Sequence, residues 1–236
     1  MILGLGEVLW DVYRDERFLG GAPANAVVHL NQLGLRAHLV SRVGKDGMGD
    51  ELLRALAEKN IDDRFIQIDK KKGTGTVAVS LDIHGQPTFA CTNDVAFDHL
   101  EVLADVEEAA QKADAVVFGL LAQRMPRSRL TIQHLVEQCE GIRLLDLNIR
   151  SFGTRSPGVV QRACGLAQIV KMNDDELEIL QRLSGLDGEP PAAFARDFVK
   201  KYGIQRLIVT HGADGASLLV GDEIHRVQGL AVEVED

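Results

Sequence analysis

The chain has 236 residues, with 35 Asp and Glu against 26 Lys and Arg, and a formal net charge of −9. This length is enough for one large α/β domain or two small ones, and the acidic balance disfavours nucleic acid or anionic membranes as partners. Three isolated cysteines, seven histidines without ligand spacing and the lack of a long apolar run predict a cytoplasmic protein without a structural zinc site or a signal peptide.

Short apolar runs alternate with helical patterns along most of the chain. The apolar runs predict strands at Ile2–Gly6, Ala37–Val43, Phe65–Ile68, Ala115–Gly119, Ile142–Leu147, Gln168–Met172 and Arg206–Thr210. The helical patterns cover Ala24–Leu33, Gly49–Lys59, Val106–Lys112, Arg129–Cys139, Asp174–Leu183 and Ala192–Tyr202. This alternation predicts βαβ units and a mostly parallel sheet with helices on both faces. Ligands of such sheets bind beyond the carboxyl ends of the strands.

Two stretches break the alternation. Residues Glu7–Leu19 show no helical pattern, and Thr74–Cys91 has the pattern of an antiparallel hairpin around the sequence HGQP. Both together predict a small additional sheet. The tail, Gly215–Val234, holds two or three further runs that resemble strands.

The segment GGAPAN predicts a small-molecule site. The glycine pair at Gly20 and Gly21 permits a tight turn and a close approach of backbone to a ligand. Pro23 suits the start of a helix, and Gly34 suits its end. Asn25 therefore projects from the first helical turn, beside backbone N–H groups that have no partner within the helix.

Residues 20–34 and the following SRVGKDGMG, residues 41–49, resemble the N-terminal signature of the ribokinase-like (PfkB) carbohydrate kinases. GGAPAN is most similar to the fructokinase branch, although Val27 replaces the small residue that is usual there. The resemblance implies one domain over residues 1–236, an α/β/α sandwich of three layers with a small β-sheet lid. Insertions at about 8–19 and 74–92 would form the lid, and two copies would pair through it.

Further motifs in the family's order imply which residues bind the sugar. A carboxylate just beyond the first strand, Asp11 in GEVLWD, can accept two hydroxyl hydrogen bonds, although a solvated turn aspartate is the alternative. TGTV resembles the lid strand that crosses the sugar, and FGLLAQR ends a strand on the ligand side. The implied sugar-binding residues are Asp11, Gly20, Gly21, Asn25, Thr76 and Gln123.

The later motifs imply a site for ATP and Mg²⁺. Arg150 in DLNIR offers a planar fork for phosphoryl oxygens, and Asn148 lies beside it. NDDEL matches the family's N-x-x-E, in which Glu176 reaches magnesium through water, while Asn173 is also a good helix N-cap. THGADG matches T-x-G-x-x-G. The implied nucleotide-binding residues are Asn148, Asn173, Thr210, Gly212 and Gly215.

These motifs imply an ATP-dependent, fructokinase-like sugar kinase that transfers the γ-phosphoryl group to a primary hydroxyl. The family's G-A-G-D motif, which carries the catalytic base, is not found within these 236 residues, and Asp236 matches only the start of that segment. We therefore expect the chain as given to be inactive. Two alternatives stay open: a kinase of another substrate such as 2-keto-3-deoxygluconate, ribose or a nucleoside, and a sugar- or nucleotide-binding protein without catalysis.

Overall fold

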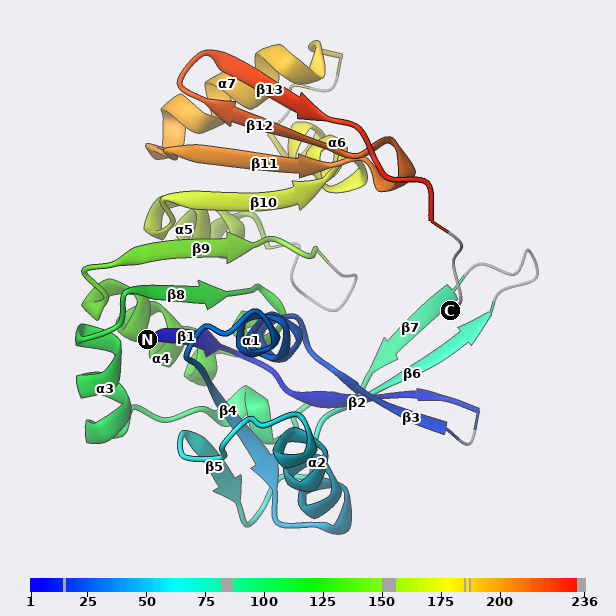
Figure 1. The fold of residues 1–236 in the computed structure, drawn as a ribbon, viewed down its shortest axis with the longest axis vertical. Coiled ribbons are helices and arrows are strands. Elements are labelled where there is room, and N and C mark those ends of the chain that lie inside the picture. The colour runs from blue at the N-terminus through cyan, green and yellow to red at the C-terminus, as the bar shows by residue number, and fades with distance from the viewer. Residues whose placement is uncertain (15, 82–86, 150–155, 185, 187, 233–236) are drawn as a thin grey trace.

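The computed structural model describes residues 1–14, 16–81, 87–149, 156–184, 186 and 188–232. Within these ranges, a nine-stranded sheet runs in the order β13-β12-β11-β10-β9-β8-β1-β4-β5 (Figure 1). Its strands are β1 (Ile2–Leu5), β4 (Ala37–Gly44), β5 (Ile66–Asp69), β8 (Ala115–Phe118), β9 (Ile142–Asp146), β10 (Ile169–Asn173), β11 (Arg206–Thr210), β12 (Ala216–Val220) and β13 (Glu223–Val227). All neighbours pair in parallel except at β12 and β13, which are antiparallel.

Helices cover both faces of this sheet, which confirms the predicted α/β class with three layers. The α-helices are α1 (Ala22–Gln32), α2 (Gly47–Glu58), α3 (Ala104–Gln111), α4 (Pro126–Gln138), α5 (Pro157–Leu166), α6 (Asp174–Leu183) and α7 (Pro191–Tyr202). Short 3-10 turns are η1 (Ala96–His99), η2 (Leu121–Gln123) and η3 (Gly212–Asp214). In Figure 1, α1 and α2 lie in front of the sheet and α3, α4 and α5 behind it. Each side has its own buried apolar cluster.

A second, four-stranded sheet lies beyond the carboxyl ends of the central strands (Figure 1). Its order is β3 (Glu16–Gly20), β2 (Leu9–Tyr13), β6 (Thr76–Leu81) and β7 (Pro87–Cys91). Both stretches that break the βα alternation thus contribute two strands each, and β2 and β6 join them in parallel. The small sheet therefore lies at the edge of the large sheet where ligands of α/β folds bind.

Helix α5 was not predicted from the sequence. Pro157 stands in its first turn, and Val159, Val160, Ala163 and Cys164 are buried on one side. Gly158 and Gly165 interrupt the helical pattern, because glycine is a poor helix former. No helix in the described part of the chain is both long and apolar enough to cross a bilayer.

Candidate functional site

A cavity of about 430 Å³ lies between the two sheets. Its lining residues are Glu7, Leu9, Asp11, Gly21, Ala22, Asn25, Ala26, Val77, Phe89, Leu121, Asp146, Asn148 and Lys171. They come from the β1–β2 connection, the first turn of α1, the small sheet, and the ends of β9 and β10. The cavity therefore brings together Asp11, Gly21, Asn25 and Asn148, which were predicted from separate motifs.

The glycine pair shapes the wall of this cavity. A methyl group at Gly20 would lie 2.1 Å from Oδ2 of Asp11, so the carboxylate occupies the space that a side chain would need. Gly21 has φ +110°, and a Cβ there would come within 2.5 Å of the Glu7 carbonyl oxygen. Both positions need glycine because backbone or carboxylate comes too close for a side chain.

Glu7 is a cavity residue that the sequence analysis did not single out. Its side chain is buried and accepts N–H bonds from Ala22 at 3.2 Å and Ala122 at 3.3 Å. Burial raises the pKa of Glu7 to about 7, and the nearby Asp146 carboxylate acts in the same direction. Glu7 therefore ties the first turn of α1 to η2. A charged residue directly after a buried strand, in GEVLWD, was the available signal.

Strands β9 and β10 supply a second set of polar side chains to the cavity wall. Lys171 Nζ donates to Oδ1 of Asp146 at 3.1 Å, and both side chains line the cavity beside Asn148. Asn148 has φ +37°, a left-handed backbone conformation that is uncommon outside glycine. Lys171 lies on β10 and Asp146 on β9, and the structure pairs these two residues in register. The sequence did not predict this contact, because it does not give the register between strands.

Three expected sugar residues, Gly20, Thr76 and Gln123, are not lining residues of the cavity. Gln123 is fully buried, donates to the Gly119 carbonyl at 2.7 Å and accepts from Gln133 at 3.1 Å, so it is not part of the cavity wall. The reason is the η2 turn, which rotates Gln123 into the interior. Thr76 bonds the hydroxyl of Thr92 at 2.7 Å, and its neighbour Val77 lines the cavity instead, since successive strand residues point to opposite faces.

The nucleotide motifs meet at the ends of β10 and β11. Asn173 is in register with Thr210, so N-x-x-E and T-x-G-x-x-G lie side by side. Asn173 caps α6, and Glu176 accepts N–H bonds from Asn173 at 2.8 Å and from Ile149 at 2.7 Å. Burial raises the pKa of Glu176, although these N–H bonds oppose the shift. Glu176 thus joins the N-terminus of α6 to the loop after β9.

The turn after β11 has the open backbone that a phosphate or ribose would need. Gly212 has φ +55°, and no other atom lies within 4 Å of the position of a Cβ there. Gly215 has φ +104°, and a Cβ would come within 2.1 Å of the Val227 carbonyl. His211 connects this turn to α6 through Asp174 at 3.0 Å and to β12 through Ser217 at 2.8 Å.

Arg150 and Asp236 lie outside the described residues. Within the part that the structure does describe, no three acidic, histidine or cysteine side chains gather into a group that could hold a metal.

Known proteins are similar to this chain in sequence and in fold. The chain is 32% identical to an uncharacterized sugar kinase of Pyrococcus horikoshii, PH1459, over 77% of this chain and 64% of that protein. It is 26% identical to a fructokinase of Escherichia coli, over 98% of this chain and 78% of that one. The crystal structure of PH1459 in complex with ATP superposes with a TM-score of 0.81, at 26% identity, over 100% of this chain and 79% of that one.

The chain thus spans about two thirds to four fifths of the length of these relatives. The pfkB family of carbohydrate kinases matches residues 5–236, which include every motif described above. This chain belongs to the pfkB carbohydrate kinase family.

Proposed function

We propose that this protein is an ATP-dependent sugar kinase of the fructokinase type. The observation that carries the proposal is that Asp11, Gly21, Asn25 and Asn148 border one cavity. Strand β10, whose Lys171 lines that cavity, ends at Asn173, which is in register with Thr210 of the neighbouring strand β11. A sugar in the cavity would therefore lie next to a nucleotide at the strand ends, as transfer of a phosphoryl group requires.

The polar groups of the cavity suit a sugar. Asp11 accepts hydroxyl hydrogen bonds, while Asn25 both donates and accepts. Val77 and Phe89 from the small sheet add apolar surface, which suits the C–H face of a sugar ring. We infer that the small sheet acts as a lid that excludes water from the reacting groups.

ATP is supported as the phosphoryl donor by the ATP complex of PH1459 and by the open turn at Gly212. Thr210, Gly212 and Gly215 would face the nucleotide, and Asn173 would lie beside its phosphates. Arg150 stays our proposed phosphate stabiliser on the strength of its motif. Bound Mg²⁺ would neutralise phosphate charge. Glu176 and Asp146 are hard oxygen donors at these strand ends, which suits a hydrated magnesium held through water.

Phosphoryl transfer also needs a general base that accepts the proton of the sugar hydroxyl. The family's G-A-G-D sequence does not occur among these 236 residues, and the G-x-G-D at 47–50 belongs to the first turn of α2 within the N-terminal signature. The buried carboxyl groups of Glu7 and Glu176 both accept backbone N–H bonds. We propose that this polypeptide binds sugar and nucleotide but does not transfer the phosphoryl group between them. A coupled assay of ADP release with fructose, ATP and Mg²⁺ tests this, and robust turnover by residues 1–236 would overturn it.

The identity of the sugar is tested by calorimetry with fructose, 2-keto-3-deoxygluconate, ribose and a nucleoside. We expect fructose to bind most tightly, and Asp11→Ala to weaken it by about 1.5–3 kcal/mol, the scale of a charge-assisted hydrogen bond. Asp63→Ala, at an exposed carboxylate, is the control. If Asp11→Ala leaves the affinity unchanged, Asp11 is a turn residue. Tight binding without turnover by any longer natural form would favour the alternative, a sensor that does not catalyse.

We also propose that two copies pair through their small sheets in the cytoplasm. Phe18 is 55% exposed and stands in register with Asp11 on the small sheet. A partner's sheet would cover this aromatic surface. As for the cytoplasm, all three cysteines are free, which suits a reducing compartment. Light scattering on the wild type and on Phe18→Ser tests the pairing: a monomeric wild type would refute it.

A further inference from the structure

A second cavity, of about 460 Å³, lies at the outer edge of the large sheet beside β4 and β5. It shares no lining residue with the first cavity. Its cationic lining residues are Arg42, Lys70, Lys71, Lys72 and Arg127. They come from β4, the loop after β5, and the first turn of α4, which are separate in the sequence and meet only in the fold.

The charge of this cavity is opposite to that of the whole chain. Five Lys and Arg residues line it, against the two carboxylates of Asp69 and Glu101, in a protein of net charge −9. Both carboxylates already have cationic partners. Arg42 lies 2.8 Å from Oδ2 of Asp69 and 3.4 Å from Glu101, and Arg127 also pairs with Glu101.

Two of the cations have no such partner. Lys72 pairs with Asp94 at the rim, whereas Lys70 and Lys71 make no ion pair with any residue that the structure describes. Two adjacent like charges without counter-ions repel one another, and an anion bound between them would remove that repulsion. The cavity therefore has a surplus of positive charge that the protein itself leaves unbalanced.

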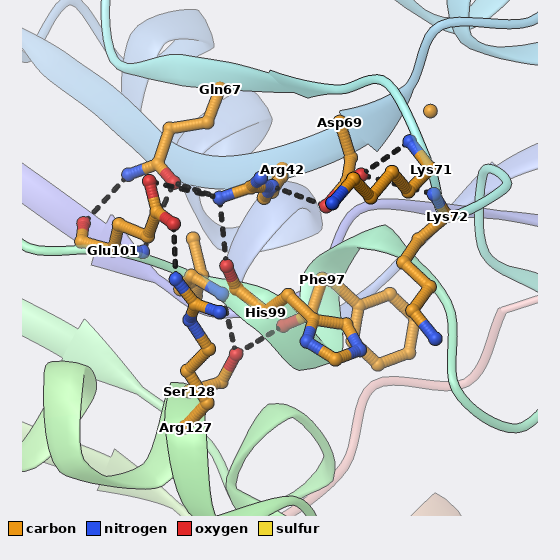
Figure 2. Close-up of polar contacts among 12 residues, drawn as sticks. Arg42, Gln67, Asp69, Lys71, Lys72, Phe97, His99, Glu101, Arg127 and Ser128 are labelled. Carbon is orange, nitrogen blue, oxygen red and sulfur yellow. Dashed lines mark hydrogen bonds and ion pairs between the residues drawn. The ribbon is translucent and has the colours of Figure 1, made fainter.

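A frame of hydrogen bonds holds Arg42 and the backbone of Lys71 and Lys72 in place (Figure 2). Arg42 donates to the His99 carbonyl at 2.9 Å, and Gln67 exchanges hydrogen bonds with the backbone of Glu101 at 2.7 and 3.0 Å. Oδ1 of Asp69 accepts the N–H groups of Lys71 at 2.8 Å and Lys72 at 3.0 Å. Burial opposes ionisation of Asp69, but these N–H groups and Arg42 hold its pKa below the usual value. The frame is thus formed before any ligand arrives.

We infer that this second cavity binds a small molecule that carries two or more phosphoryl groups. Its volume lies within the range of ligand pockets and exceeds what a single phosphate ion would fill. Lysine and arginine are the side chains that bind phosphoryl oxygens most strongly. This inference does not depend on the proposed kinase activity, because it uses none of the residues of the first cavity.

Pyrophosphate is a suitable probe. Lysine acylation is followed by mass spectrometry on residues 1–236, with and without metal-free pyrophosphate. We expect protection of Lys70, Lys71 and Lys72, with no change at the exposed Lys59 and Lys201. Lys171 reports on the first cavity. Protection at Lys171 alone would place the anion in the first cavity and overturn the inference.

Calorimetry supplies the second readout. Lys70→Glu with Lys71→Glu is expected to weaken pyrophosphate binding at least about tenfold, as the loss of charge-assisted hydrogen bonds predicts. Lys59→Glu with Lys201→Glu changes the net charge equally and should leave the affinity within about twofold. Equal weakening by both pairs would mean nonspecific attraction and refute the site. Because Lys70 and Lys71 are exposed, the variants should fold, and Lys70→Gln with Lys71→Gln repeats the test without charge reversal.

Discussion

The Asp11 side chain of β2 reaches diagonally across to Gly20 of β3, whose partner in register is Leu9, so closely that a methyl group at Gly20 would lie 2.1 Å from the Asp11 carboxylate. Such a contact is shorter than any van der Waals separation, so Gly20 determines where the Asp11 side chain can lie. The first glycine of the GGAPAN motif is therefore linked to an aspartate that belongs to a different motif.

This relationship predicts that Gly20→Ala displaces the Asp11 carboxylate and weakens sugar binding. We expect a loss of about 1.5–3 kcal/mol, similar to that of Asp11→Ala, because both changes remove one charge-assisted hydrogen bond. The measurement is calorimetry with fructose. Gly165→Ala, where the added methyl meets no atom within 4 Å, is the control.

The double variant Asp11→Ala with Gly20→Ala sharpens this test. If Gly20 acts through Asp11, the double variant binds no more weakly than Asp11→Ala alone. Additive losses would mean that Gly20 contacts the ligand by itself or that the substitution disturbs the small sheet.

Gly212→Ala should weaken ATP binding more than sugar binding. A side chain there enters open space next to the proposed phosphates, and φ +55° adds backbone strain of about 1 kcal/mol. Gly221→Ala is a matched control, since Gly221 has φ +59° and equally open surroundings but lies in the turn between β12 and β13. Titration with a fluorescent ATP analogue measures the difference. Equal effects of both variants would show that strain alone is responsible.

Local motifs predicted part of this site. The residues of GGAPAN are consecutive, running from the end of β3 into the first turn of α1, so their spacing fixes their geometry. Asn25 borders the cavity. Asn173 and Thr210 were expected near each other because parallel strands end at the same edge. The βα alternation likewise predicted all seven parallel strands, β1, β4, β5, β8, β9, β10 and β11, to within one residue at each end, since each is a short buried apolar run between helical patterns.

Other features depend on pairing that spacing does not encode. Lys171 meets Asp146 because β10 pairs with β9 in a particular register. Gln123 lies in the η2 turn after β8, where its side chain is directed into the interior and bonds the Gly119 carbonyl. The strand pattern of the sequence does not predict such a turn. Strands β2 and β3 gave no clear pattern because burial does not alternate along them: Leu9 and Trp10 are both buried, whereas residues 16–18 are exposed.

The buried Glu7 predicts how stability changes with pH. Its pKa is about 7 in the folded protein and near 4.5 when the chain is unfolded, so the folded state binds the proton more tightly. Its contribution is fully present below pH 4.5 and is lost as pH rises through 7. Over this interval the free energy of unfolding should fall by up to about 3 kcal/mol on account of Glu7.

Glu7→Gln should flatten that decline. Urea unfolding between pH 5 and 8 measures it, with Glu58→Gln at an exposed carboxyl as the control. The glutamine accepts one N–H bond rather than two, so the variant is expected to be less stable than the wild type at pH 5. A pH dependence that stays the same in the Glu7→Gln variant would contradict the shifted pKa.

The ion pair between Arg124 and Asp98 joins the small sheet to the core. Arg124 donates to both carboxylate oxygens of Asp98, at 2.8 and 2.7 Å, and to the Thr92 carbonyl just after β7 at 2.6 Å. The two side chains are 5% and 0% exposed. Arg124→Met leaves the Asp98 carboxylate buried without its cation, so we expect a loss of about 3–5 kcal/mol in the free energy of unfolding.

Asp98→Asn in the Arg124→Met background removes the buried charge and should restore part of that loss. The coupling energy follows from urea unfolding of both single variants and the double variant. Because Asp98 also accepts the Val95 N–H at 3.1 Å, the asparagine can keep this bond through its carbonyl oxygen. Since Arg124 contacts the end of β7, hydrogen exchange at Ala90 and Cys91 should speed up in Arg124→Met. Unchanged exchange there, together with additive losses of stability, would mean that the pair neither couples the two residues nor anchors the small sheet.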